Sequence, residues 1–279
     1  MSSVTARINS IKQPYGGYIK PSQFEVTILD DGAVLDSNEN IHPNVVGMAV
    51  DYLTRFCIGK DKAEAFRISL QGAELAENIG VKNSVSIANN FLKGVKGLDD
   101  ESVLNACKLV SYDVWYRNPL GAFMAKTYQD INPDKTTINN IQILVRRGIY
   151  FFETYGPVTK DGFTFEPENG TVKDYEKMIQ TGKGAFGGYT ATVNTGDGDF
   201  LTSDTLWDFK VSKAKPTSKH TLQLLMYWIM GQHSKQDFFK KITKLGIFNP
   251  RLNSVYILDM HCINQDLIKT VERDVICYE

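Results

Sequence analysis

The chain has 279 residues, a net charge of −1 and a composition of 42% hydrophobic and 23% charged residues, which is ordinary for a folded globular protein. It contains no apolar run of the roughly 18 residues that a membrane-spanning helix needs, and its N-terminus lacks the apolar core of a signal peptide. We therefore expect a cytoplasmic protein with no membrane partner.

The cysteines and histidines do not indicate a structural metal site. None of the cysteines belongs to a C-x-x-C pair, and the histidines lack the spacing of metal ligands. We therefore expect reduced and mostly buried thiols at Cys57, Cys107, Cys262 and Cys277.

The charges are unevenly distributed along the chain. Between Phe209 and Leu258 there are nine Lys or Arg residues and one acidic residue, whereas the rest of the chain has 22 basic and 31 acidic residues. A nearly neutral chain can therefore carry a local positive surface that attracts a polyanion. A solvated lysine-rich surface without a partner is the simpler alternative.

The N-terminal half reads mainly as helix. Residues 18–35 read as a short extended segment with a turn at 30–32, and helical periodicity begins at Pro43. Apolar residues recur on one face near 43–58, and Gly59 ends that helix. Further helices are predicted at 61–79, 81–95, 99–117 and 137–154.

The pattern changes after Gly156-Pro157, where short strands become frequent. Strands are predicted at 162–166, 188–193, 198–201, 205–212, 245–249 and 254–260, and helices at 216–231, 234–244 and 263–274. This order predicts an α/β protein with a mixed sheet flanked by helices and a large helical section in the N-terminal half. The predicted division is a helical section over 1–156, with 43–58 as a candidate core helix, and an α/β core over 157–279.

Asp199, Asp208 and Lys210 lie close together in the segment GDGDFLTSDTLWDFKVSK. Residues i and i+2 of a strand share a face, so Asp208 and Lys210 point the same way, and Trp207, Phe209 and Val211 point to the core. If the two strands form a hairpin, Asp199 converges with Asp208. Two such carboxylates favour a divalent cation of the Mg²⁺ type. A lysine beside them suits metal-assisted phosphodiester hydrolysis.

The following helix adds polar residues to an otherwise apolar sequence. Gln223 and Tyr227 are four residues apart and share a helix face, which Lys219 extends by one turn. Buried amide and hydroxyl groups need partners, and a neighbouring catalytic site would provide them. The simpler alternatives are backbone partners for this pair, and a surface ion pair for Asp208 and Lys210 worth at most about 1 kcal/mol.

GDGDFL, LWDFK and the Q-x-x-x-Y helix, in this order and spacing, resemble the motifs of the PD-(D/E)xK nuclease superfamily, and most closely its RecB-like branch. The resemblance is strongest over residues 187–231. It implies a restriction-endonuclease-like α/β core in which Asp199 and Asp208 bind Mg²⁺ or Mn²⁺ and Lys210 is the catalytic lysine. Gln223 and Tyr227 would support the site and contact DNA.

A weaker resemblance to the same branch lies upstream. YIKPSQFE is similar to its S-P-S-x-x segment, and VVGMAVDYL is similar to its G-x-x-V-H-x-x-L segment, with Asp51 where a histidine is usual. Asp51 is thus a candidate metal ligand, and Glu153 and Glu166 are alternatives. On this interpretation one domain spans the chain, with residues 60–185 largely a helical insertion. The cysteines do not match those of cluster-binding relatives, so no iron–sulfur cluster is expected.

The leading hypothesis is a Mg²⁺-dependent DNA nuclease. Lys213, Lys215 and Lys219 would contact DNA phosphates. No G-x-x-x-x-G-K-[ST] motif is present in the sequence, so a helicase would be a separate chain. The alternatives are a non-catalytic nuclease-fold protein that binds DNA or a protein partner, for example a phage defence or counter-defence factor, and an unrelated α/β binding protein.

Overall fold

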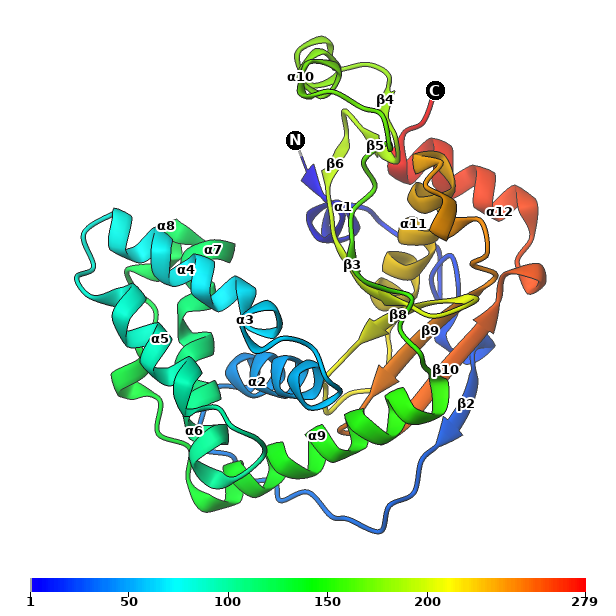
Figure 1. Ribbon diagram of the computed structural model, residues 1–279. Coiled ribbons are helices and arrows are strands. Elements are labelled where there is room, and N and C mark those ends of the chain that lie inside the picture. Colours follow the sequence, from blue (N-terminus) through cyan, green and yellow to red (C-terminus); the bar gives the residue numbers. More distant parts are fainter. Residues whose placement is uncertain (1) are drawn as a thin grey trace. The chain divides into compact units, whose positions relative to one another are not determined.

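The computed structural model describes residues 2–279 and divides the chain into two compact units (Figure 1). The helical unit is Asp30–Thr154, one continuous stretch. The sheet unit combines the residues before Asp30 with Tyr155–Glu279. The segment before Asp30, which the sequence analysis grouped with the helical section, thus belongs to the sheet unit.

The helical unit consists of short helices and one long one. They are α2 (Pro43–Cys57), α3 (Lys62–Ala65), α4 (Arg67–Asn78), α5 (Ser84–Gly94), α6 (Asp100–Leu109), the 3₁₀ turn η2 (Val110–Tyr112), α7 (Asp113–Arg117), α8 (Pro119–Ala122), the 3₁₀ turn η3 (Tyr128–Asp130) and α9 (Lys135–Tyr155), whose last residue belongs to the sheet unit.

A sequence signal explains the start of α2, whereas two predicted helices are interrupted. Pro43 occupies the first turn of α2, where its missing N–H costs nothing, and His42 caps the helix by accepting from Asn44 N. The helix predicted at 61–79 is interrupted at Phe66, which is fully buried. The helix predicted at 99–117 is interrupted by η2, just before Asp113, a buried carboxylate that accepts hydrogen bonds from two hydroxyl groups.

The sheet unit is built around strands and one central helix. Its elements are β1 (Ser2–Ser3), α1 (Val4–Ser10), η1 (Pro21–Gln23), β2 (Glu25–Ile28), β3 (Lys160–Phe163), α10 (Val172–Thr181), β4 (Ala185–Phe186), β5 (Tyr189–Thr190), β6 (Val193–Thr195), β7 (Gly198–Leu201), β8 (Thr205–Phe209), α11 (Ser218–Ser234), η4 (Asp237–Phe239), β9 (Lys244–Asn249), β10 (Ser254–Asp259), η5 (Met260–Cys262), α12 (Gln265–Thr270) and a π-helical turn (Val271–Ile276).

The main sheet has six strands in the order β2-β10-β9-β8-β7-β3, and its central strands lie side by side in Figure 1. The pair β8–β9 is parallel and the other pairs are antiparallel. Parallel neighbours need a crossover connection, which α11 provides. The prediction of an α/β protein with a helical N-terminal region and a mixed sheet flanked by helices is therefore confirmed.

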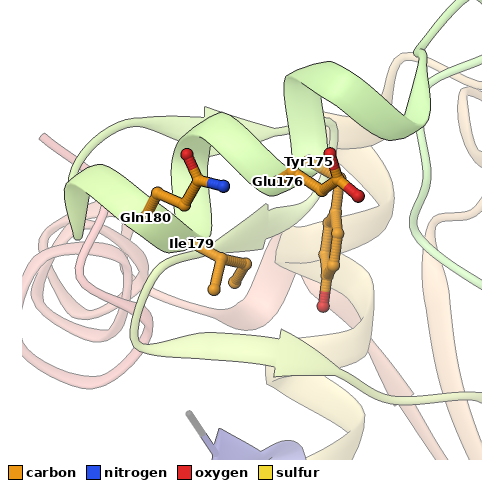
Figure 2. A pocket seen from close by; sticks show the side chains of 4 residues that line it. All are labelled: Tyr175, Glu176, Ile179 and Gln180. Carbon is orange, nitrogen blue, oxygen red and sulfur yellow. The ribbon is translucent and has the colours of Figure 1, made fainter.

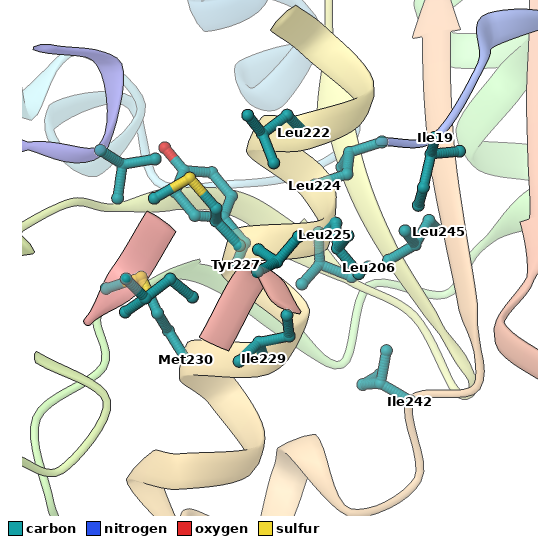
Figure 3. Packing of buried hydrophobic residues seen from close by; sticks show 14 of the residues in the cluster. Ile19, Leu206, Leu222, Leu224, Leu225, Tyr227, Ile229, Met230, Ile242 and Leu245 are labelled. Atoms are coloured by element: carbon teal, nitrogen blue, oxygen red, sulfur yellow. The ribbon is translucent and has the colours of Figure 1, made fainter. Parts of the chain in front are cut away.

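The two faces of β8 are both buried, but against different partners. Leu206 belongs to a core cluster with Leu245, Ile247 and the apolar residues of α11, which Figure 3 shows around Leu222, Leu225 and Ile229. On the opposite face Trp207 stacks on Phe200 and covers Gly246. A Cβ at Gly246 would lie 2.3 Å from the indole ring, so only glycine fits there.

Some predicted elements are wrong. The helix expected at 234–244 is only the turn η4, because Lys235 adopts a left-handed backbone (φ 59°) that ends α11. The last predicted helix changes to a π-helical turn at Val271. Three helices were not predicted, namely α1, α8 and α10. A reciprocal hydrogen-bond pair between Thr171 and Asp174 caps α10.

None of the described helices is both long enough and apolar enough to cross a membrane.

Candidate active site

The hairpin of β7 and β8 brings Asp199 and Asp208 to the same face of the sheet. Phe200 pairs with Trp207 in this hairpin, and continuing that register by one residue aligns Asp199 with Asp208. Asp199 Oδ2 accepts a hydrogen bond from the backbone N of Phe209 at 2.7 Å, so its carboxylate lies beside the end of β8. Alternation places both carboxylates on the face opposite Trp207, as predicted.

Lys210 follows the last residue of β8 and turns back toward Asp208. Its backbone N still bonds Phe248 O at 2.9 Å, and its ammonium donates to Asp208 Oδ1 at 2.9 Å. Burial lowers the pKa of Lys210, but the nearby carboxylates of Asp208 and Asp199 outweigh it, so the pKa lies above its ordinary value. Lys210 is therefore a cation at neutral pH and cannot act as a base.

The expected burial of Trp207, Phe209 and Val211 is complete only at Trp207. Trp207 is fully buried, whereas Phe209 and Val211 are half-buried. Phe209 is the last residue of β8, and Val211 lies beyond it, where period-two alternation no longer applies. Phe209 still packs its ring against Phe248, with centroids 5.4 Å apart.

Asp208 is the most unusual side chain of the cluster. It is 4% exposed, and its Oδ2 is buried without a hydrogen-bond partner among residues 2–279. A buried carboxylate oxygen normally has a donor, and its absence costs free energy unless another group compensates. The unpaired oxygen therefore marks a position where a cation could bind.

Helix α11 contributes two side chains that continue the hydrogen-bond chain. Gln223 Oε1 accepts from Lys210 Nζ at 3.3 Å, and Gln223 Nε2 donates to the Tyr227 hydroxyl at 3.0 Å. The Lys210 ammonium can only donate hydrogen bonds, so the Gln223 amide must turn its oxygen toward Lys210 and its nitrogen toward Tyr227. The structure thus brings together Asp208, Lys210, Gln223 and Tyr227. Burial, with the neighbouring carboxylates, raises the pKa of Tyr227, which remains protonated.

His220 also belongs to this cluster, although the sequence analysis did not select it. Its Nδ1 accepts from Thr217 N at 3.1 Å, so in the neutral ring the proton is on Nε2. Burial and the positive charge of Lys210 lower its pKa below the ordinary 6.5. The signal was present in the sequence, because His220, Gln223 and Tyr227 follow an i, i+3, i+7 spacing on one helix face.

Asp197 is a second residue that the sequence analysis left out. The negative charges of Asp208, Asp197 and Asp199 all act on Tyr227 and help to raise its pKa, after burial itself. Asp197 is exposed and precedes Asp199 by two residues. The D-x-D spacing in a strand-like segment could have indicated that both carboxylates point to the same side.

The three lysines expected to contact DNA are all exposed, but their settings differ. Lys213 and Lys215 lie in the connection from β8 to α11, and Lys219 lies in the first turn of the helix. The Lys219 ammonium donates to Asn9 Oδ1 of α1 at 2.7 Å. Lys219 is therefore directed toward α1 rather than along the face of Gln223 and Tyr227.

The candidates for a third acidic ligand are found in different places. Asp51 lies on α2 in the helical unit, and its Oδ1 accepts from Arg55 Nε at 2.8 Å. Glu153 also belongs to the helical unit. Glu166 lies in the sheet unit after β3 and is exposed. The assignment of the first motif to any of these three residues stays a prediction.

Within residues 2–279 no three His, Cys, Asp or Glu side chains form a cluster that could hold a metal ion. Asp199 and Asp208 nevertheless suit Mg²⁺, which is often bound through one or two carboxylates and keeps several of its waters. The unpaired Oδ2 of Asp208 is the observation in favour of this fit.

A shallow hollow on α10 is a separate feature. Its lining residues are Tyr175, Glu176, Ile179 and Gln180, all from one helix (Figure 2). None of them belongs to the Asp208 cluster, so the hollow does not define the candidate site.

Comparison of the chain with protein-family models, with curated proteins and with solved structures found no match.

Proposed function

We propose that this chain is a Mg²⁺- or Mn²⁺-dependent nuclease of the PD-(D/E)xK type, RecB-like branch, that hydrolyses phosphodiester bonds of DNA. On this proposal the sheet unit is a restriction-endonuclease-like core. The observation that carries the proposal is the carboxylate of Asp208. It is buried, one of its oxygens has no partner among the described residues, and it lies beside a lysine kept protonated.

Asp199 and Asp208 are the residues that would hold the metal ion. When bound, such an ion lowers the pKa of a coordinated water and stabilises charge on the phosphoryl oxygens.

The remaining residues of the cluster have roles that follow from their contacts. Lys210 is positioned to donate a hydrogen bond to a phosphate oxygen, where a fixed cation stabilises the negative charge that develops during hydrolysis. Gln223 holds the ammonium through its Oε1 and is itself held by Tyr227. The hydrogen-bonded chain therefore fixes the direction of Lys210 before substrate binds.

A second candidate is a nuclease-fold protein that binds DNA or a protein partner without cutting. One observation favours it, which is that Lys210 already pairs with Asp208 at 2.9 Å and partly neutralises its charge. A buried ion pair of this kind could serve the fold alone.

The test is digestion of DNA by the purified protein. Linear and circular, single- and double-stranded DNA are incubated with Mg²⁺, with Mn²⁺ or with EDTA. We expect cleavage that requires the metal and that is lost in Asp208→Asn and in Lys210→Met. The panel also distinguishes exonuclease from endonuclease activity.

The chain offers a matched control in Lys244, which pairs with Asp204 at 2.8 Å at the opposite end of β8 and β9. Lys244→Met removes an ion-paired lysine from the same sheet and should leave cleavage intact. Absence of cleavage by the wild-type protein on every substrate, together with metal-independent DNA binding, would favour the second candidate.

A further inference from the structure

The loop between α1 and η1, residues 11–20, is attached to the first turn of α11. Just before the loop, Asn9 of α1 accepts a hydrogen bond from the Lys219 ammonium, and near the end of the loop Ile19 O accepts one from Thr221 Oγ1 at 2.6 Å. Between them Gly17 lies so close to Ser218 that a Cβ at this glycine would be 2.5 Å from the serine Cβ. The second half of the loop is therefore attached to the helix at Gly17 and Ile19.

The first turn of α11 lies at the same end of the helix as the candidate site. His220 lies in this turn within the electrostatic influence of Lys210 and Asp208, and Gln223 follows one turn later and contacts Lys210. A loop attached at residues 218 and 221 therefore lies at the same end of α11 as the catalytic cluster.

The tip of the loop presents an aromatic ring to solvent. Gly17 N donates to Pro14 O at 2.8 Å, and Gly16 has φ +84°, which together describe a type II turn with Tyr15 at its second position. Tyr15 is fully exposed. Full exposure of a tyrosine on a well-anchored turn leaves both ring faces accessible to a flat partner.

Basic side chains accompany this ring. The stem of Lys20 lies along Gly16, since a Cβ there would be 3.2 Å from Lys20 Cε. Lys12 is also in the loop and is exposed. The first acidic residue of the chain is Glu25, and the charged residues before it, Arg7, Lys12 and Lys20, are all basic. An exposed aromatic ring among lysines is the combination that single-stranded nucleic acid recognises by base stacking and phosphate contacts.

We propose that residues 11–20 form a single-strand-binding element, in which Tyr15 stacks on an unpaired base and Lys20 contacts an adjacent phosphate. The inference rests on the proposed nuclease function and specifies its substrate, namely DNA that is single-stranded where it enters the site. Base pairs inside a duplex are stacked on both faces and offer no free face to Tyr15, so duplex DNA gains little from the loop.

The experiment measures binding without cleavage. Fluorescein-labelled single-stranded oligonucleotides and a blunt duplex of the same sequence are titrated with protein in EDTA. We expect Tyr15→Ala to weaken single-strand binding by roughly 5- to 150-fold, the range for stacking of one base, and to leave duplex binding unchanged. Tyr15→Phe should stay within about twofold of wild type, because the ring is kept.

Two controls make the interpretation specific. Tyr150 on α9 is another exposed tyrosine, and Tyr150→Ala should have no effect on binding. An abasic site scanned along the oligonucleotide should weaken wild-type binding at one position and have no further effect on Tyr15→Ala.

The contact of Lys20 with phosphate is tested separately. Lys20→Gln should reduce the salt dependence of single-strand binding by about 0.7 in log–log slope, the value for one neutralised phosphate on a single strand.

Equal affinity of wild type and Tyr15→Ala for the single strand would overturn the inference, and so would an equal loss on the duplex or no single-strand binding by wild type. These results are separable from the nuclease assay. A protein that cuts DNA but is insensitive to Tyr15→Ala refutes only the loop proposal. A protein that shows the stacking effect but does not cut refutes only the nuclease.

Discussion

Replacement of Lys210 by methionine should destabilise the protein far more than replacement of Lys244, although each lysine forms one ion pair. The partner of Lys210 is Asp208, whose side chain is 6% exposed, whereas Asp204, the partner of Lys244, is 42% exposed. Lys210→Met therefore leaves a carboxylate buried without a cation. Lys244→Met leaves a carboxylate that water can solvate.

The magnitude follows from these exposures. Removing one partner of a fully buried pair costs roughly 3–5 kcal/mol, and a surface pair is worth at most about 1 kcal/mol. The side chain of Lys210 is 29% exposed, so water partly solvates the pair, and we expect a loss of about 2–3 kcal/mol. Lys244→Met should cost under about 1 kcal/mol.

The assay is thermal unfolding followed by circular dichroism in EDTA. A loss of this size corresponds to a decrease in Tm of roughly 5–10 °C for Lys210→Met. The double variant Asp208→Asn with Lys210→Met should recover most of that decrease, because the uncompensated charge is gone. Equal decreases for Lys210→Met and Lys244→Met, or no recovery in the double variant, would refute the reasoning.

Three other outcomes are expected. Replacing Lys213, Lys215 and Lys219 by glutamine should weaken duplex binding, and the log–log salt slope measured by titration should fall by about 0.9 for each phosphate that is no longer neutralised. The pKa of His220 is lower in the folded protein than in the unfolded chain, so as the pH decreases the unfolded chain takes up this proton at a higher pH than the folded protein does. Stability should therefore be full above pH 6.5 and fall as the pH decreases below it, and Tm measured between pH 5 and 8 should vary less in His220→Gln. Asp51→Asn should slow cleavage if Asp51 is the first-motif carboxylate. It should lower Tm little, because the pair with Arg55 is a helical i, i+4 pair, and unchanged cleavage would exclude that role.

The alternation of apolar and polar residues in β8 correctly predicted which side chains lie on each face of the strand. A period of two fixes which residues share a face, so Trp207 was placed in the core and Asp208 opposite it from TLWDF alone. Full burial was not reached at Phe209 or Val211, because nothing in the local sequence shows that the strand ends at Phe209. Strand ends depend on where the neighbouring strands stop, which is a tertiary property.

The contacts of the candidate site were only partly accessible from sequence. The spacing of Gln223 and Tyr227 predicted their common helix face, and the structure adds that Gln223 reaches Lys210. Lys219 has the same spacing but bonds to Asn9, because α1 packs beside the start of α11. That hydrogen bond joins residues 210 positions apart in the sequence, and a local sequence pattern cannot predict a contact between such distant segments. The helix α1 itself was missed for a similar reason, since its seven residues are too few to show clear periodicity.

The connectivity of the sheet has a consequence for how the chain folds during synthesis. Strand β2 is completed only by β10, and its residue Val26 pairs with Tyr256, 230 positions later. At about 5–20 residues per second, β2 leaves the ribosome roughly 10–50 s before its partner. The helical unit is continuous in sequence and can fold during this interval.

The early strand meanwhile exposes Val26 and Ile28, which remain half or more exposed even in the finished sheet. An unpaired apolar strand of this kind can associate with other nascent chains. The time for which β2 lacks its partner is therefore set by the sequence separation of β2 and β10, independently of how stable the completed protein is.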